Sequence, residues 1–230
     1  MAPAKAQSEE REFTPALGRP ELTAHYDQTI RFWTREALWR EMLVRRINPQ
    51  PGDTILDVGC GTGSLAIHLK VRCPAARVVG IDPDPEALSI ARGKADQAGV
   101  DVSLRRGFAR DVGLLHPGGG AKVISTLMFH QVPVAEKVRG VAAMFTAACG
   151  GEIHVADYAL QPGLFMRSLF RATVQRLDGK ENTQPNADGI LERLLTNGSG
   201  RAVTPWARIR TPSGAISLFH IPGPPLSTPF

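Results

Sequence analysis

The sequence predicts an α/β fold, namely a doubly wound, mostly parallel sheet with helices on both faces and a C-terminal antiparallel hairpin. Strand-like apolar runs alternate five times with helical patterns between residues 54 and 157, which is typical of a parallel sheet. Two further strand-like runs, 202–210 and 215–221, are joined by the short turn Thr211-Pro212-Ser213-Gly214. So short a turn implies an antiparallel hairpin.

The elements of this fold are expected in a regular order. An amphipathic cap helix at 26–47 precedes the first strand, because apolar side chains recur there at helical spacing. The alternating strands are expected at 55–58, 77–82, 102–104, 122–127 and 152–157. The helices between them are expected at 64–72, 84–97 and 134–148. An insertion at 160–200 holds a helix at 164–177, a polar loop at 178–189 and a shorter helix at 190–195, and serves as a lid or as a plain surface connection.

Length and composition describe an ordinary globular chain. Its 230 residues are 43% hydrophobic and 21% charged, which is enough for one domain with its own core. We expect a flexible arm at 1–20, a single domain at 21–221 and a frayed, proline-rich tail at 222–230. The net charge of +5 permits an acidic partner but does not indicate one, and no feature predicts an oligomeric state.

The cysteines and the apolar runs indicate the compartment. Cys60, Cys73 and Cys149 lie far apart without metal-ligand spacing, which argues against a disulfide framework and a structural zinc site. No apolar run approaches the ~18 residues that span a bilayer, and the N-terminus lacks a signal core. We therefore expect a cytoplasmic protein with no metal and no membrane span.

The glycine turn after the first strand selects the ligand. A dinucleotide fingerprint needs G-x-G-x-x-G, whereas here Gly59, Gly61 and Gly63 are evenly spaced and the third glycine falls one residue early. Asp57 also sits at the mouth of the turn, where it would repel a pyrophosphate. A ligand that carries an amine or a sulfonium cation would not be repelled, so a nicotinamide dehydrogenase is disfavoured.

At this point the sequence resembles the class I S-adenosylmethionine-dependent methyltransferases, with their Rossmann-like fold. The stretch from Ile55 to Gly63 is similar to the first motif of the family, and the strand that ends in Asp82 is similar to its second signature. The segments 125–132 and 150–157 resemble the stretch after strand four and the turn into strand five. The resemblance covers about residues 24–221 and is strongest to the small-molecule branch that includes the ubiquinone/menaquinone-biosynthesis C-methyltransferases. It implies S-adenosyl-L-methionine as cofactor and a small-molecule acceptor.

The resemblance also implies a set of cofactor-binding residues. Asp82 would accept two hydrogen bonds from the ribose hydroxyls, and Asp57 would orient the turn or receive the methionine ammonium. Phe108 stands where relatives often carry an acid for the adenine amino group, which leaves that contact to a backbone carbonyl or to Asp111. The full set is Asp57, Gly59, Cys60, Gly61, Thr62, Gly63, Asp82, Pro83, Gly107, Phe108, Ala109, Ser125 and Met128.

The acceptor side is predicted from residues near the ends of strands four and five. His130 is the candidate general base, because it follows strand four and the pKa of histidine lies near neutrality. The alternative is a histidine that is hydrogen-bonded to nearby backbone. Tyr26, Asp157 and Tyr158 are expected around the substrate, whereas His154 lies inside strand five and is expected in the core.

Two alternatives to small-molecule methylation stay open. A macromolecular acceptor is disfavoured, because no Asn-Pro-Pro-aromatic motif and no Pro-Cys pair follows strand four, and we expect no nucleic-acid partner. The loops at 148–149 and 197–200 depart from the family pattern. That departure leaves room for a protein that binds S-adenosylmethionine without methylating.

Overall fold

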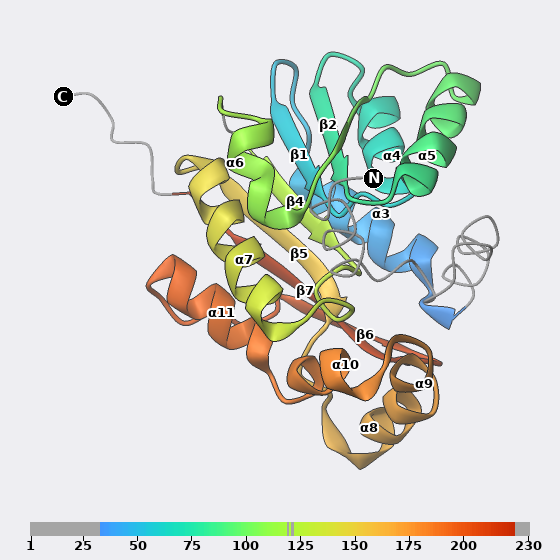
Figure 1. Cartoon of the computed structure of the whole chain (residues 1–230), viewed down its shortest axis with the longest axis vertical. Coiled ribbons are helices and arrows are strands. Elements are labelled where there is room, and N and C mark those ends of the chain that lie inside the picture. Colours follow the sequence, from blue (N-terminus) through green and yellow to red (C-terminus); the bar gives the residue numbers. More distant parts are fainter. Residues whose placement is uncertain (1–32, 119, 121, 224–230) are drawn as a thin grey trace, which may run out of the picture.

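The computed structural model describes residues 33–118, 120 and 122–223, so the expected arm at 1–20, Tyr26 and most of the expected tail lie outside the described residues. Its core is one seven-stranded sheet in the order β3-β2-β1-β4-β5-β7-β6 (Figure 1). Strands β1 to β5 pair in parallel, and β7 runs antiparallel to both β5 and β6. The predicted fold class is confirmed. The strands are β1 (Thr54–Val58), β2 (Arg77–Asp82), β3 (Ser103–Arg106), β4 (Lys122–Thr126), β5 (Glu152–Tyr158), β6 (Ala207–Thr211) and β7 (Gly214–Ile221).

Helices cover both faces of this sheet. In Figure 1, α6, α7 and α11 lie in front of the sheet and α3 and α4 lie behind it. One buried cluster joins α3 and α4 to their face, and a second joins α6, α7 and α11 to the other. The short helices α8 to α10 gather at one end of the molecule. The helices are α3 (Glu36–Ile47), α4 (Ser64–Arg72), α5 (Pro85–Gln97), α6 (Val112–Leu115), α7 (Val134–Ala148), α8 (Gly163–Ala172), α9 (Val174–Asp178), α10 (Lys180–Ala187) and α11 (Ile190–Ser199), with a 3₁₀ turn at Ala109–Asp111. No helix of the described part is long and apolar enough to cross a bilayer.

Local chemistry explains why the central elements form where they do. Strand β1 is buried along nearly its whole length, because both of its faces are covered by helices, as in other parallel sheets. Helix α5 begins at Asp84, whose side chain accepts a hydrogen bond of 2.8 Å from the Glu86 N–H, and Pro85 occupies the first turn. Strands β1 and β4 are neighbours at the point where the strand order reverses, which is where ligands bind in such sheets.

The expected cap helix at 26–47 is present from Glu36 to Ile47, but it is interrupted just before Glu36. Arg35 adopts a left-handed conformation with φ of 51°, so α3 begins only at Glu36. Apolar periodicity persists across such a break, because it reports which side chains face the core and not the φ of a single residue. Residues 26–32 lie outside the described part of the chain.

The insertion at 160–200 is more helical than its sequence indicates. The expected helix 164–177 is two helices, α8 and α9, and the expected polar loop 178–189 contains α10. Polar side chains stabilise α10 by tertiary hydrogen bonds: the Asn186 amide donates to the Tyr158 carbonyl at 2.7 Å, and the Asn182 amide donates to the Gln131 carbonyl at 2.8 Å. The polar sequence of this segment indicated a loop, because hydrogen-bond partners from distant parts of the chain cannot be read from the sequence.

The hairpin is present, but its first strand is shorter than expected. Strand β6 begins at Ala207 and not at residue 202. Pro205, which has no N–H, lies just before it and cannot donate to a sheet ladder.

Candidate functional site

The glycine turn between β1 and α4 leaves open backbone at its centre. Gly59, Gly61 and Gly63 all have positive φ, a conformation that glycine adopts without strain. A Cβ on Gly59 would lie 2.5 Å from Cγ of Met128, whereas a Cβ on Gly61 would meet no atom within 4 Å. The turn is therefore packed against the segment after β4 on one side and is open at Gly61.

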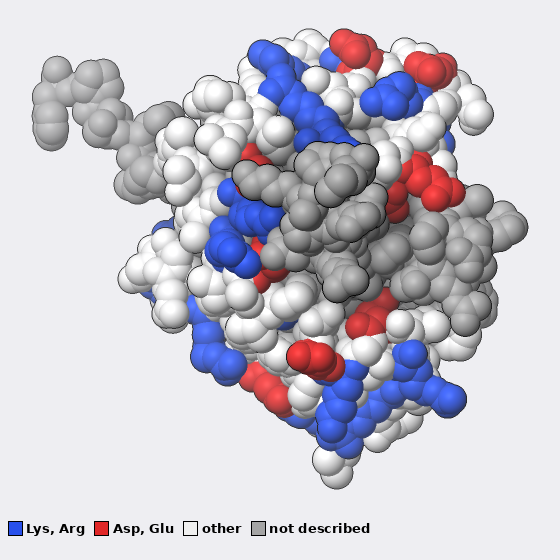
Figure 2. All heavy atoms as spheres, in the orientation of Figure 1, with Lys and Arg blue, Asp and Glu red and all other residues white. Residues whose placement is uncertain are grey.

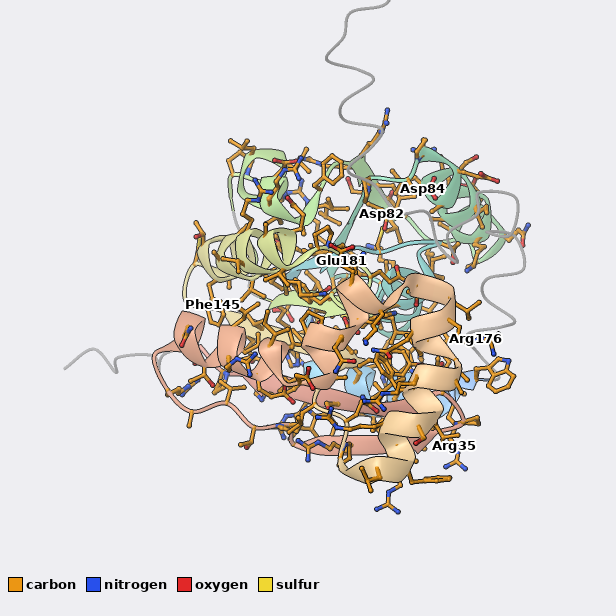
Figure 3. The ribbon with its side chains drawn as sticks, turned by 60° about the horizontal axis from the view of Figure 1, so that its bottom comes forward. Arg35, Asp82, Asp84, Phe145, Arg176 and Glu181 are labelled. Carbon is orange, nitrogen blue, oxygen red and sulfur yellow. The ribbon has the colours of Figure 1, made fainter. Side chains whose placement is uncertain are left out.

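Asp82, at the end of β2, ties its strand to this turn. One carboxylate oxygen accepts a hydrogen bond of 2.8 Å from the Gly61 N–H, and the other accepts one of 2.9 Å from the Asp84 N–H. Burial raises the pKa of Asp82 to about 6, although both hydrogen bonds lower it. Figure 3 shows Asp82 and Asp84 together at this end of the molecule, with Glu181 of α10 on the same side.

Asp57 and Ser125 are buried polar side chains on neighbouring strands. Neither Asp57 oxygen, nor the Ser125 hydroxyl, has a hydrogen-bond partner among the described residues. Burial raises the pKa of Asp57 to about 7. The positive charge of Arg40 and the nearby backbone N–H of Ala66 oppose that rise, but the Ala66 N–H does not reach hydrogen-bond geometry. Burying an unpaired carboxylate is costly, so Asp57 fits a site that receives a cationic or hydrogen-bond-donating group.

The remaining predicted cofactor residues surround the turn with different side-chain contacts. Cys60 is buried, and a Cβ on Gly80 of β2 would lie 2.9 Å from its sulfur; burial raises the pKa of its thiol. Thr62 accepts a hydrogen bond from Lys94 of α5 at 3.1 Å. Both side chains contact neighbouring elements, Cys60 at β2 and Thr62 at α5, and so join the turn to them.

The predicted adenine edge lies at the 3₁₀ turn after β3. The Phe108 N–H donates to the Asp111 carboxylate at 3.3 Å, and the Arg110 guanidinium lies 4.2 Å from the centre of the Phe108 ring. Gly107 and Ala109 are half-buried beside it, and Pro83 is half-buried after β2. Asp111 therefore already holds the backbone of Phe108.

His130 is buried between two carboxyl groups. Its Nδ1 donates to Asp157 at 2.6 Å, and its Nε2 lies 3.5 Å from an oxygen of Asp178 at the end of α9. Burial lowers the pKa of His130, but the two carboxylates outweigh burial and raise it to about 9. The expectation that the pKa of His130 lies near neutrality is therefore wrong. No pattern in the sequence indicated that Asp178 would lie beside His130.

Asp157 and Tyr158 are both occupied by the protein itself. Asp157 is fully buried, and its second oxygen accepts a hydrogen bond of 2.7 Å from the Phe129 N–H. The Tyr158 hydroxyl shares a hydrogen bond of 2.5 Å with the Ser213 hydroxyl, and its ring meets that of His130 edge-on. Their place beside a substrate stays a prediction, whereas their contacts with His130 are part of the structure.

Sequence reasoning missed two charged residues of this site. Asp178 falls in the polar loop expected at 178–189, as a lid or a plain connection, and Lys137 falls in the expected helix 134–148, where it was given no role. Lys137 is fully buried on α7 and donates a hydrogen bond to the Phe129 carbonyl. A lysine at a position of the helical apolar stripe, next to Val141 and Met144, was the available signal.

A second histidine cluster lies at the other end of β5. Glu152, His154 and His220 place potential metal-ligand atoms within 4.8 Å of one another. The rings of His154 and His220 stack with an interplanar angle of 14°, and Arg46 donates to Nδ1 of His220 at 3.2 Å. The proton of His220 is thereby placed on Nε2, which faces Glu152, so the cluster is arranged as a hydrogen-bonded network.

Comparison with known proteins identifies the family. Residues 55–149 match a family model described as a methyltransferase domain. A demethylmenaquinone methyltransferase of Thermus thermophilus is 31% identical over 166 residues, which cover 69% of this chain and 74% of that protein. A ribosomal protein L11 methyltransferase of Burkholderia mallei is 48% identical over only 65 residues, 28% of this chain and 20% of that protein. The structure of the pyocyanin biosynthetic protein PhzM has a TM-score of 0.65 at 18% identity and covers 97% of this chain and 65% of PhzM, which shows a shared fold.

The family and the geometry agree on the cofactor. The open backbone at Gly61, the unpaired Asp57 and the acid that ends β2 suit a nucleoside that carries an ammonium and a sulfonium. Together with the relative that matches most of both chains, these features show that the chain belongs to the class I S-adenosylmethionine-dependent methyltransferases.

Proposed function

We propose that this enzyme methylates a small organic acceptor by in-line displacement, with His130 as the group that takes the acceptor proton. The observation that carries the proposal is the buried pair of His130, from the segment after β4 that packs against the glycine turn, and Asp157 of β5. The relative from Thermus thermophilus is named for a quinone-type acceptor, and PhzM for the biosynthesis of pyocyanin. Both names support a small acceptor.

The cofactor is held, in this proposal, by the two acids of β1 and β2. Asp82 has lone pairs beyond those used by Gly61 and Asp84, and these would accept the ribose hydroxyls. Asp57 would receive the ammonium, which would satisfy its unpaired oxygens. When bound, S-adenosylmethionine supplies an activated methyl group on a sulfonium centre. The protein then has mainly to position the acceptor, which can lower a barrier by roughly 7–11 kcal/mol in ideal cases.

His130 would act through Nε2, since Asp157 holds Nδ1. An acceptor that reaches Nε2 must replace Asp178, whose oxygen lies 3.5 Å away. Asp157 would keep the ring oriented during the exchange. The insertion at 160–200 thus controls access to His130 in this proposal, because Asp178 and Asn182 both contact the segment after β4.

The charge on the described part of one face favours a small acceptor over a nucleic acid at that face. On the face seen in Figure 2, lysines and arginines form separate groups with acidic and uncharged side chains between them. A nucleic-acid site would need a continuous basic surface to neutralise successive phosphates.

Calorimetric titration with S-adenosylmethionine tests the cofactor site. We expect Asp82→Ala to weaken binding at least about tenfold, because a charge-assisted pair of hydrogen bonds is lost. Asp101→Ala, which removes an exposed acid beyond α5, is the matched control and should bind like the wild type. Equal affinity of Asp82→Ala and wild type would refute the ribose role.

A pH–rate profile tests His130. A base must be neutral, so kcat/KM should rise with pH until it passes the pKa near 9. His130→Gln should lose this limb and about 10²–10⁴-fold in rate. The assay uses small phenols and quinols as acceptors, beside ribosomal protein and RNA. Methylation of the macromolecules alone would overturn the proposed acceptor class.

A further inference from the structure

The strongest unexplained feature near the site is a lysine with no exposure to solvent. Lys137 lies on α7, and its relative accessibility is 0%. Removing an ammonium group from water is costly unless it is paired, so a fully buried lysine needs a specific partner. Its neighbour Arg139 is instead exposed and pairs with Glu136, as is usual for a helix surface.

The hydrogen-bond partner of Lys137 is the carbonyl of the peptide bond that joins Phe129 to His130. The ammonium donates a hydrogen bond to the carbonyl of Phe129. The N–H of the same residue donates to Asp157 at 2.7 Å. Phe129 is thus held at both ends of its backbone, and its buried ring packs against Gly140 of α7. His130 follows Phe129 in the chain, so these two hydrogen bonds fix the backbone from which the His130 imidazole extends.

Lys137 also belongs to a cluster of charged groups around His130. The groups that face His130 are Asp157 and Tyr158 from β5 and Asp178 from α9. Lys137 approaches from α7, where the charge of Asp157 acts on it. Burial lowers the pKa of Lys137 to about 8, while the charge of Asp157 opposes that effect. Lys137, His130 and Asp157 are buried, so their charges are screened less than they would be at the surface.

We propose that Lys137 is a positioning residue for methyl transfer, which holds the Phe129 peptide, and with it the backbone of His130, in place. The geometry that carries the proposal is the pair of hydrogen bonds on Phe129, one to its carbonyl from Lys137 and one from its N–H to Asp157, which also binds the His130 ring. The inference rests on the proposed role of His130 as the base.

The variant Lys137→Met tests this, because it keeps an unbranched side chain of similar length without the charge. The amide NMR resonance of His130 should shift, because the Phe129 carbonyl loses its donor. At saturating cofactor, kcat should fall about tenfold or more with little change in the KM for S-adenosylmethionine, because the imidazole is displaced while the cofactor site is untouched. Arg139→Met, on the exposed side of α7, should leave both quantities unchanged.

An unchanged kcat in a folded Lys137→Met enzyme would overturn the proposal, as would an unchanged His130 amide resonance. If this variant does not fold, the wild-type chain still gives a test. The side-chain carbon next to the Lys137 ammonium should titrate well below the ordinary lysine value of 10.5. Titration at the ordinary value would overturn the proposal. The NMR readouts do not depend on activity, so a His130→Gln enzyme of normal rate would refute the proposed function alone.

Discussion

A buried histidine lies at each end of strand β5, and the pKa values of the two histidines are shifted in opposite directions. At the carboxyl end, His130 faces two carboxylates that raise its pKa to about 9. At the amino end, burial lowers the pKa of His154, and the single carboxylate of Glu152 does not compensate. Glu152 is half-buried and is shared with His220, whereas Asp157 is fully buried and its oxygen lies 2.6 Å from His130.

This contrast shows that burial alone does not make a titrating site. Burial disfavours the charged form of both histidines, and the number and burial of the opposing charges decide the outcome. The amino end serves stability, because its stacked rings join β5 to β7. At the carboxyl end, two carboxylates and a buried lysine surround one histidine, and such clusters of titratable groups are typical of functional sites.

Removing Asp157 should break the contrast most strongly. Asp157→Asn leaves the buried His130 and Lys137 with one carboxylate fewer, and losing one partner of a buried pair typically costs about 3–5 kcal/mol. The pKa of His130 should then fall toward the behaviour of His154. Denaturant unfolding and NMR titration measure the two effects. A stability loss below about 1 kcal/mol would show that the pair is not coupled as the geometry implies.

The pH dependence of stability should carry both signatures. The folded pKa of His130 is raised, so its contribution is complete below the ordinary value of 6.5 and is lost as pH rises through about 9. That interval corresponds to roughly 3 kcal/mol. The folded pKa of His154 is lowered, so its contribution is present above 6.5 and is lost as pH falls below it.

Urea unfolding between pH 5 and pH 10 measures these contributions. The variant His130→Gln should flatten only the alkaline side of the profile, and His154→Gln only the acid side. A profile whose alkaline side is the same in His130→Gln and in wild type would contradict the raised pKa.

Glu152→Gln should have the smallest effect and sharpens the contrast from the other end. The hydrogen bond from His154 is the main reason that the pKa of Glu152 is lowered to about 2, but its side chain is 37% exposed. Solvent screening therefore limits the expected loss of stability to under about 1 kcal/mol. Methyl transfer should be unaffected, because this end of β5 lies away from the glycine turn. A loss of activity would show that the two ends are coupled.

The position of each group in the chain explains which parts of the site could be predicted. The glycine turn, Asp57 and Asp82 form local patterns at strand ends, and the alternation of strands places them at one edge of the sheet. His130 was found for the same reason. Asp178 and Lys137 were missed, because each reaches the cluster from a helix whose docking depends on tertiary contacts, such as that between Asn182 and Gln131. The polar helix α10 was missed on the same ground.

The sequence by itself determined the doubly wound sheet, the glycine turn and the acid at the end of β2, since these follow from local periodicity, turn chemistry and strand order. Only the tertiary structure decided which carboxylates face His130, and only it left the buried Asp57 oxygens without a hydrogen-bond partner among the described residues. Proton affinity depends on burial and on charges within a few ångströms, and in this protein those charges come from β5, α7 and α9. No local sequence pattern predicts that charged residues from these three elements lie close together.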